Sequence, residues 1–386
     1  MTESYDYIIL GGGAAGLSLA YLMSNEPFFS NKKILLLEKE EKDKNDRIWC
    51  YWETEQGLWN NLITKKWEQI KFIGDQFKKE VPIQPYAYKC LRSIDFYRKT
   101  KLEIHKTGLI EIRKEEVVSF KDQSETVEVI TTKNKYQALH IFSSISFDKE
   151  YKKQKIYPLL NQHFIGWFIK TNEPVFDEDI ATFMDFSIPQ EANTRFMYLL
   201  PFSTTEALFE YTLFSEDLLP TEQYEKGITD YLDNLGIIDY TITEKERGCI
   251  PMTSYDFARN NSKNILHIGT VGGWTKASTG FTFQNTTRKT KELVTYLKTG
   301  QTNLKNFNRR TRFWGYDLLF LDVLYQYNHR GAELFSLLFQ KNKVTTILRF
   351  LEEKTTLSEE IKIMASMPTM LFAKTLFKRI FRMRSK

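Results

Sequence analysis

The sequence is poor in cysteine and histidine. It has three cysteines (Cys50, Cys90 and Cys249) and five histidines among 386 residues. So few cysteines, in an odd number, do not form a disulfide framework, and they indicate a reducing compartment. The histidines show no metal-ligand spacing with one another or with cysteine. We therefore expect no metal site.

Long apolar runs are also missing. No uncharged stretch of about 18 strongly apolar residues occurs, so the sequence predicts no membrane-spanning helix. The apolar segment from Ile8 to Met23 follows acidic residues and is interrupted by glycines, which is not the pattern of a signal peptide. We expect a cytoplasmic protein that can still lie on a membrane.

Net charge is low, whereas aromatic residues are plentiful. Lys and Arg total 54 against 49 Asp and Glu, and this formal charge of +5 gives no indication of nucleic-acid binding. Aromatic residues make up 15% of the chain, which excludes a disordered polymer. The length fits two domains, or one large α/β domain with an insertion.

A glycine-rich turn near the N-terminus joins a predicted strand to a predicted helix. Residues 7–10 are a short apolar run typical of a buried parallel strand. In the turn that follows, Gly11 permits a tight bend and Gly13 lets the backbone approach a pyrophosphate. Gly16 lets the helix pack closely on the sheet.

Two further residues extend this motif. Ala14 lies where the predicted helix begins, and the free N–H groups of a helix N-terminus hold phosphate. A second predicted strand, residues 34–37, ends in Glu38, which can accept hydrogen bonds from ribose hydroxyls. The arrangement predicts a dinucleotide, and its place at the extreme N-terminus favours FAD over NAD by analogy between folds. The alternative is a tight turn that binds nothing.

A second glycine cluster follows the predicted strand 265–269 and precedes a predicted helix over residues 281–297. Two such turns far apart in the chain suit one extended dinucleotide held at both ends. We assign five residues of this cluster to the cofactor: Gly269, Gly272, Gly273, Thr279 and Gly280. The alternative is a loop that serves only the chain's topology.

Three blocks of sequence resemble a known family. Residues 46–53 read D-R-I-W-C-Y-W-E, residues 91–97 read L-R-S-I-D-F-Y, and residues 195–212 contain R-F-M-Y-L-L-P and A-L-F-E-Y-T. Together with the second glycine cluster, they resemble the FAD-dependent lycopene cyclases of bacteria over roughly residues 5–330. Flavoproteins of this kind often have Gly-Asp where this chain has Gly269-Thr270. The resemblance therefore does not imply a contact from an aspartate carboxylate at position 270 to the ribityl chain.

The resemblance implies an α/β fold with a Rossmann-like FAD-binding domain, of the glutathione reductase or p-hydroxybenzoate hydroxylase type. It also implies an inserted β-sheet substrate domain. We expect residues 1–60, 80–150 and 250–300 in the FAD-binding domain, 61–79 and 151–249 in the substrate domain, and 301–386 in a helical C-terminal region.

Glu210 is the candidate catalytic acid. It stands in the apolar predicted strand 207–214, where alternation places it on the face opposite Phe209 and Tyr211. If its face lines an apolar pocket, burial raises the pKa of Glu210, so it stays protonated and can protonate an alkene. The alternative is an ordinary surface acid. The resemblance favours catalysis, although the family's second glutamate falls on Tyr211.

Aromatic residues are candidates for the substrate site. A polyene needs an apolar tunnel, and aromatic faces stabilise a carbocation. Ordinary aromatic packing is the alternative for each of them. The residues that we assign to substrate binding are Trp49, Tyr51, Trp52, Phe209 and Tyr211.

The implied activity is that of a lycopene β-cyclase, which closes β-ionone rings on the ψ ends of lycopene without net redox change. Glu210 is implied as acid and base, reduced FAD as charge stabiliser, NADPH as reductant, and Arg92 as a cofactor ligand. For Arg92 the alternative is a surface salt bridge. The rival functions are a geranylgeranyl reductase-like or hydroxylase flavoprotein and a non-enzymatic lipid-binding or escort protein of FAD fold.

The C-terminal segment, residues 364–386, contains six Lys and Arg and no Asp or Glu, so residues 1–363 together carry −1. On a helical wheel, Lys374, Lys378 and Arg382 line one side and apolar residues share the other. A basic amphipathic helix predicts an anchor on the inner face of the cell membrane, close to a lipid-dissolved substrate. The alternative is a helix packed on the body with a solvated basic face.

Overall fold

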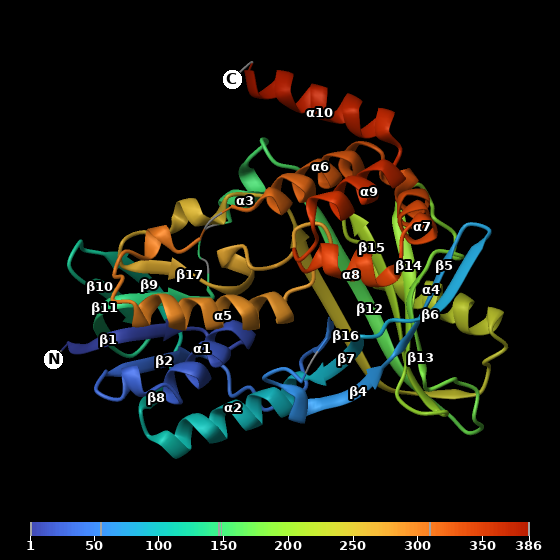
Figure 1. The fold of residues 1–386 in the computed structure, drawn as a ribbon. Coiled ribbons are helices and arrows are strands. Elements are labelled where there is room, and N and C mark those ends of the chain that lie inside the picture. Colours follow the sequence, from blue (N-terminus) through green and yellow to red (C-terminus); the bar gives the residue numbers. More distant parts are fainter. Residues whose placement is uncertain (1, 55, 146, 148, 309, 385–386) are drawn as a thin grey trace.

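The first large sheet contains the strand, glycine turn and helix predicted at the N-terminus. The computed structural model describes residues 2–54, 56–145, 147, 149–308 and 310–384 (Figure 1). The strand order is β8 (Ile110–Lys114), β2 (Ile34–Glu38), β1 (Glu3–Leu10), β11 (Lys135–Ser143), β10 (Val127–Thr131) and β9 (Val117–Asp122), and β17 (Ile265–His267) pairs with β11.

Both faces of this sheet are covered, which explains the continuous apolar runs in β1 and β2. Ile9 packs on one face with residues of α1 (Ala14–Ser24), α2 (Ser93–Thr107) and α5 (Phe283–Lys298). Ile8 packs on the other face with valines of β9 and β10. A strand buried on both sides has no polar alternation.

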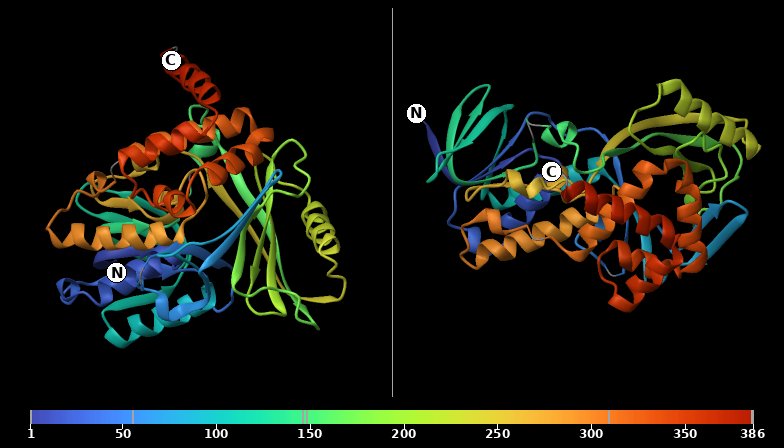
Figure 2. Two further views of the ribbon diagram at one scale, coloured as in Figure 1. Left: turned by 45° about the vertical axis from the view of Figure 1, so that its right-hand side comes forward. Right: turned by 90° about the horizontal axis from the view of Figure 1, so that it is seen from above.

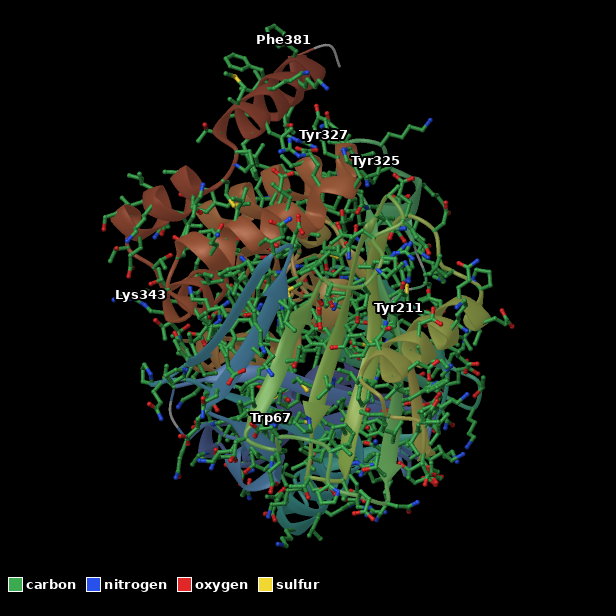
Figure 3. The ribbon with its side chains drawn as sticks, turned by 90° about the vertical axis from the view of Figure 1, so that its right-hand side faces the viewer. Trp67, Tyr211, Tyr325, Tyr327, Lys343 and Phe381 are labelled. Atoms are coloured by element: carbon green, nitrogen blue, oxygen red, sulfur yellow. The ribbon has the colours of Figure 1, made fainter. Side chains whose placement is uncertain are left out.

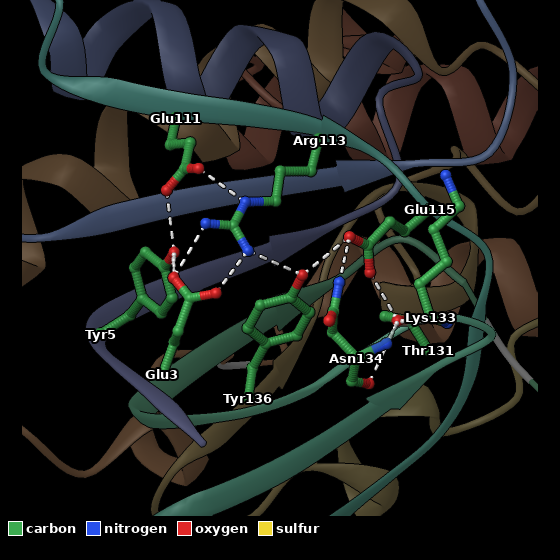
Figure 4. Close-up of polar contacts among 9 residues, drawn as sticks. All are labelled: Glu3, Tyr5, Glu111, Arg113, Glu115, Thr131, Lys133, Asn134 and Tyr136. Carbon is green, nitrogen blue, oxygen red and sulfur yellow. Dashed lines mark hydrogen bonds and ion pairs between the residues drawn. The ribbon is translucent and has the colours of Figure 1, made fainter. Parts of the chain in front are cut away.

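A polar network fixes one end of the sheet. Arg113 donates to both carboxylate oxygens of Glu3, at 2.7 and 2.8 Å, and to the Tyr136 hydroxyl at 3.0 Å (Figure 4). The Tyr136 hydroxyl donates to Glu115 at 2.8 Å. The hydrogen bonds from Arg113 lower the pKa of Glu3 to about 2. The network ties β8 to β1 and β11.

The second large sheet is built from two separate stretches of chain. Its order is β16 (Tyr240–Met252), β12 (Leu160–Thr171), β15 (Glu206–Ser215), β14 (Thr194–Pro201), β13 (Ile180–Asp185), β5 (Gln69–Gly74) and β6 (Phe77–Pro82). The expected domain boundary at residues 79 and 80 falls inside β6. Because β5 and β6 pair along their whole length, this part of the substrate domain extends to Pro82.

A small sheet of β3 (Ile48–Glu53), β7 (Ala87–Arg92) and β4 (Ile63–Trp67) completes the β structure. β4 therefore pairs with β7 rather than with the substrate sheet in which its residues were expected. Trp67 at its end is buried and donates from Nε1 to the Pro201 carbonyl at 3.0 Å, which links the small sheet to β14 (Figure 3).

Helices of the C-terminal region cover one face of the second sheet. They are α6 (Arg312–Gln326), α7 (Gly331–Lys341), α8 (Val344–Leu351) and α9 (Leu357–Ser366), and α10 (Thr369–Arg384) follows them in the chain. The Phe339 ring stacks on Phe72 of β5, with centroids 4.1 Å apart. The last helix, α10, extends away from the body (Figure 2). Among the described residues, no helix combines the length and hydropathy needed to span a bilayer.

Candidate functional site

A cavity of about 460 Å³ brings together segments that are far apart in the sequence. Residues at the start of α1 and in the second glycine cluster line it, and so do residues of β3, β12, β14, β15 and β16. The two glycine turns and the strand that carries Glu210 thus share one cavity.

The glycines of the first turn have the geometry that the motif predicts. Gly11 has a φ of +93°, which favours glycine, and a Cβ on Gly16 would lie 1.9 Å from the Gly11 carbonyl oxygen. Gly13 has no atom within 4 Å of the place where a Cβ would lie, and Gly13 and Ala14 line the cavity. The N-terminus of α1 therefore opens to the cavity, with room for a ligand's phosphate.

Glu38 lies beside this turn but is not part of the cavity lining. Its Oε2 accepts a hydrogen bond from the Gly12 N–H at 2.5 Å, and its Oε1 accepts one from the Glu40 N–H at 2.9 Å. The carboxylate is thus held at the carboxyl end of β2, where the ribose contact was predicted.

The second glycine cluster also adopts backbone conformations that favour glycine. Gly269, Gly273 and Gly280 have φ values of +64°, +73° and +74°. Gly269, Thr279 and Gly280 line the cavity, whereas Gly272 packs so closely that a Cβ would lie 2.2 Å from the His267 carbonyl oxygen. Gly272 and Gly273 do not line the cavity, and their role is to permit the backbone conformation of the turn.

Two carboxyl groups lie in one row across the second sheet. Gly166 of β12 pairs with Glu210 on one side and with Glu246 on the other, and Glu210 pairs in turn with Tyr198. Directly opposed residues project from the same face, and Tyr198, Glu210 and Glu246 all line the cavity. Each glutamate shifts the pKa of the other, and the Thr212 hydroxyl donates to Glu210 Oε1 at 2.7 Å.

Burial controls the protonation of this pair. It raises the pKa of Glu210 to about 7. Burial also raises the pKa of Glu246 well above its usual range, and the adjacent Glu210 raises it further. A pair of carboxyl groups in such a setting retains a proton at neutral pH and can act as an acid.

Glu246 is a candidate functional residue that sequence reasoning missed. It stands in β16, where exposed and half-buried residues alternate and many side chains are charged. That pattern is typical of a solvated edge strand. Only the register that places Glu246 opposite Gly166 brings it to Glu210.

The structure corrects the assignment of Phe209 and Tyr211 to substrate binding. Both pack on the opposite face of the sheet with residues of α4 (Thr221–Asn234). A Cβ on Gly227 of that helix would lie 2.6 Å from the Tyr211 ring. Arg195 donates to the Tyr211 hydroxyl at 3.1 Å, and Figure 3 shows Tyr211 beside the helix. Alternation turns both residues away from the cavity because Glu210 faces it.

The aromatic residues of β3 divide between two cavities. Trp49 lines the main cavity and stacks on Phe283, with centroids 4.7 Å apart. Tyr51 and Trp52 line a second cavity of about 20 Å³, which shares Thr279 with the first. Of the three, Trp49 is therefore the one placed to contact a ligand in the main cavity.

The structure supports the alternative interpretation of Arg92. Its guanidinium forms an ion pair with Glu244 of β16 and lies over the Phe168 ring. Arg92 is not among the residues that line the main cavity. We therefore withdraw the prediction that it binds the cofactor directly, because its charge is already used to join β7 to β16.

The residues present fit a bound dinucleotide. Both glycine turns leave room at the cavity. Four lining residues have enclosed oxygens with no hydrogen-bond partner within the described chain: Gln162, Glu246, Thr279 and Thr286. Buried polar atoms are rarely left unsatisfied, so a polar ligand in the cavity is the expected partner of these atoms.

Comparison with solved structures identifies the fold. A geranylgeranyl bacteriochlorophyll reductase-like protein from Thermoplasma acidophilum has a TM-score of 0.70 at 11% identity, over 97% of this chain and 99% of that chain. The halogenase PltM, in a variant form in complex with FAD, has a TM-score of 0.63 at 12% identity, over 90% of this chain and 82% of that chain. A flavoprotein/dehydrogenase from Cytophaga hutchinsonii scores 0.62 at 11% identity, over 94% and 100%. These likenesses confirm the predicted flavoprotein fold.

The sequence comparison reaches the level of the family. No curated protein sequence matches the chain at a significant level. The model of the family described as "Lycopene cyclase protein" matches residues 6–376, which is nearly the whole chain. The family that the sequence blocks indicated is thereby confirmed: the chain belongs to the lycopene cyclase family.

Proposed function

We propose that this protein is a lycopene β-cyclase that binds FAD and cyclises the ψ ends of lycopene. The observation that carries the proposal is the position of Glu210. Its carboxyl group, with a pKa raised by burial to about 7, faces the cavity that both glycine turns line. An acid of this kind next to a flavin-type site is what proton-initiated cyclisation requires.

The proposed reaction begins and ends on Glu210. Its carboxyl group gives a proton to the terminal double bond, the neighbouring double bond closes the ring, and a ring carbon returns one proton to the Glu210 carboxylate. No electrons are gained or lost, so the product is an isomer of the substrate. Trp49, Tyr88 and Tyr198 line the cavity, and their aromatic faces can stabilise the intermediate cation.

The cofactor is proposed to lie along the two glycine turns. Gly13 and Ala14 would face its phosphates at the start of α1, and Gly269, Thr279 and Gly280 would face the rest of the molecule. Reduced FAD bound there supplies a negatively charged ring system that stabilises the cation. NADPH is the proposed reductant.

Production of the protein in cells that accumulate lycopene tests this function. Chromatography of the pigments should show cyclised carotene. Products with fewer double bonds than lycopene would instead identify a reductase of the geranylgeranyl reductase type. Unchanged lycopene from cells that contain folded protein would contradict the proposal and favour the lipid-binding alternative.

Cyclisation is expected to slow as the pH rises through about 7. Glu210 donates only when protonated, and its pKa of about 7 means that the active form predominates below that pH. The turnover rate of the purified flavoprotein, measured across the pH range at saturating lycopene, should fall by about tenfold per pH unit above the midpoint. A rate that is flat from pH 6 to pH 9 would exclude Glu210 as the donor.

We also propose that α10 rests on anionic lipid. Met370, Phe377 and Phe381 are 82%, 63% and 63% exposed, and Figure 3 shows Phe381 pointing outward near the far end of the helix. Arg379 pairs with Asp322 of α6, which ties the helix to the body. The structure describes the side chains of this helix as far as Phe381, and Ser385 and Lys386 lie outside the described residues. Exposed aromatic residues beside cations fit a lipid surface.

A double variant in which Ser replaces both Phe377 and Phe381 tests the lipid contact. Binding to vesicles that contain phosphatidylglycerol should fall by about tenfold or more, because two apolar side chains no longer enter the lipid. Deletion of residues 364–386 should do the same and leave FAD binding intact. The control, Ile238→Ser, changes a residue that is 82% exposed in the loop before β16. Equal vesicle binding by all forms would refute the proposal.

A further inference from the structure

We infer that Glu246 is a positioning residue for Glu210: it remains a neutral carboxylic acid and donates a hydrogen bond to the carboxylate that Glu210 becomes after giving up its proton. The inference rests on the proposed function and assigns a role to a residue that the family's sequence blocks do not include. Its basis is the geometry of the row that Glu246, Gly166 and Glu210 form.

The pairing of three strands places the two carboxyl groups on either side of one residue. Gly166 of β12 pairs directly with Glu210 of β15 and with Glu246 of β16. Residues two strands apart are normally separated by the side chain between them. Here that residue is glycine, so no side chain stands between the two glutamates and they can approach each other across it.

Leu208 and Glu246 occupy the space above Gly166. A Cβ at Gly166 would lie 3.0 Å from Glu246 Cγ, 3.1 Å from Glu246 Oε1 and 2.8 Å from a methyl group of Leu208. Any larger residue would push Glu246 aside. The glycine is thus required for the side-chain contact, because its φ is not among the positive values that favour glycine.

The surroundings of Glu246 favour its neutral form. Its Oε1 is enclosed and has no hydrogen-bond partner within the described chain. The backbone of Ile48 in β3 acts in the opposite direction and lowers the pKa of Glu246, but the effect of burial is larger. Taking a charge into such a site is costly, and the pKa of Glu246, raised by burial and by Glu210, keeps the proton on Glu246 when Glu210 ionises.

The phenols and the thiol nearest the pair are neutral. Burial raises the pKa values of Tyr88 and Tyr198 well above their usual range, and a hydrogen bond with Cys90 does so for Cys50. The charged residues that line the same cavity are Lys42, Asp46, Arg47 and Arg247. Within the described part of the chain, no cation forms a hydrogen bond or ion pair with either glutamate, so Glu246 and the Thr212 hydroxyl are the groups placed to stabilise ionised Glu210.

The role of Glu246 can be followed through one turnover. Glu210 transfers its proton to the terminal alkene carbon and becomes a carboxylate, while Glu246 keeps its own proton and donates to that carboxylate. A ring carbon then returns one proton to Glu210. The pair begins and ends with the same number of protons, and no oxidant or reductant is consumed. A hydrogen-bond donor to the conjugate base makes Glu210 a stronger acid than burial alone would allow.

Two substitutions at Glu246 distinguish a hydrogen-bond donor from a proton donor. Glu246→Gln keeps an N–H donor but has no acidic proton, whereas Glu246→Met keeps the length and has neither. We expect the Gln form to cyclise lycopene at a rate within about tenfold of the wild-type rate. The rate of the Met form should fall by about 10- to 100-fold, because it loses a hydrogen bond to a charged group. The midpoint of the pH–rate profile should move up by about one unit in the Met form alone.

A spectroscopic titration of the resting protein with FAD bound adds a readout that needs no turnover. The infrared band of the Glu210 carboxylic acid, identified by its loss in Glu210→Gln, should disappear near pH 7 in the wild-type and Glu246→Gln forms and at higher pH in Glu246→Met. Glu206→Gln, at the exposed start of β15, is the matched control and should change neither measurement.

The outcomes separate this inference from the proposed function. A Glu246→Gln form as inactive as Glu210→Gln would make Glu246 the proton donor and overturn the inference, while the cyclase proposal would stand. A Glu246→Met form with wild-type rate and midpoint would also overturn it. If the wild-type protein does not cyclise lycopene but the infrared midpoint still moves in Glu246→Met, the proposed function fails and the hydrogen-bonded pair is supported.

Discussion

Replacement of Glu210 with Gln is expected to lower the rate of lycopene cyclisation by about 10²- to 10⁴-fold, the usual contribution of a general acid. Gln has nearly the shape of Glu and can still accept the hydrogen bond that Thr212 donates at 2.7 Å. It has no proton to transfer at any pH near neutrality. The measurement is the initial rate of product formation by purified protein, with FAD content determined from its absorbance.

The control for this result lies in the same strand. Glu206 is the first residue of β15, is exposed and pairs with Lys170 at 3.0 Å. Glu206→Gln removes a carboxylate from β15 without changing the cavity and should leave the rate unchanged. A Glu210→Gln protein that binds FAD and cyclises lycopene at the wild-type rate would remove Glu210 from the mechanism.

The second large effect is expected at Gly13, where a side chain should abolish FAD binding. The protein itself leaves room for a side chain at this position, since no atom lies within 4 Å of the point that a Cβ on Gly13 would occupy. The φ of Gly13, −80°, also suits any residue. Gly13→Leu would instead place a bulky group at the N-terminus of α1, where the phosphates are proposed to bind. We expect protein that is purified without flavin and has the melting temperature of the wild-type protein stripped of its flavin.

A matched control separates this effect from a general cost of replacing glycine. Gly315 in α6 is exposed and likewise has no atom within 4 Å of a Cβ, but it is not among the residues that line the cavity. Gly315→Leu should retain FAD. A Gly13→Leu protein with full flavin content would show that the cofactor does not approach the start of α1.

The features predicted from the sequence were those that local chemistry specifies. The turn at Gly11, Gly13 and Gly16 is encoded within six residues, so its geometry follows from the sequence alone. Alternation in the strand around Glu210 likewise placed its side chain opposite Phe209 before any pairing was known. The same alternation places Phe209 and Tyr211 on the face away from the cavity. Adjacency to Glu210 in the sequence is therefore no reason to assign them to the substrate site.

The features that were missed depend on pairing between distant strands. Glu246 comes to Glu210 because β12 lies between β15 and β16 and offers a glycine at the shared position. Arg92 meets Glu244 for the same kind of reason, since β7 and β16 are far apart in the chain and adjacent in the fold. No periodicity within one segment contains this information.

The central claim is that the protein isomerises lycopene, and the mass of the product tests it most directly. Purified protein with reduced FAD, kept free of oxygen, should convert lycopene in lipid vesicles to a cyclic carotene of the same mass. NADPH should be consumed only in reducing the flavin once. A product heavier by pairs of hydrogen atoms, with NADPH consumed in proportion, would contradict the account and identify a reductase.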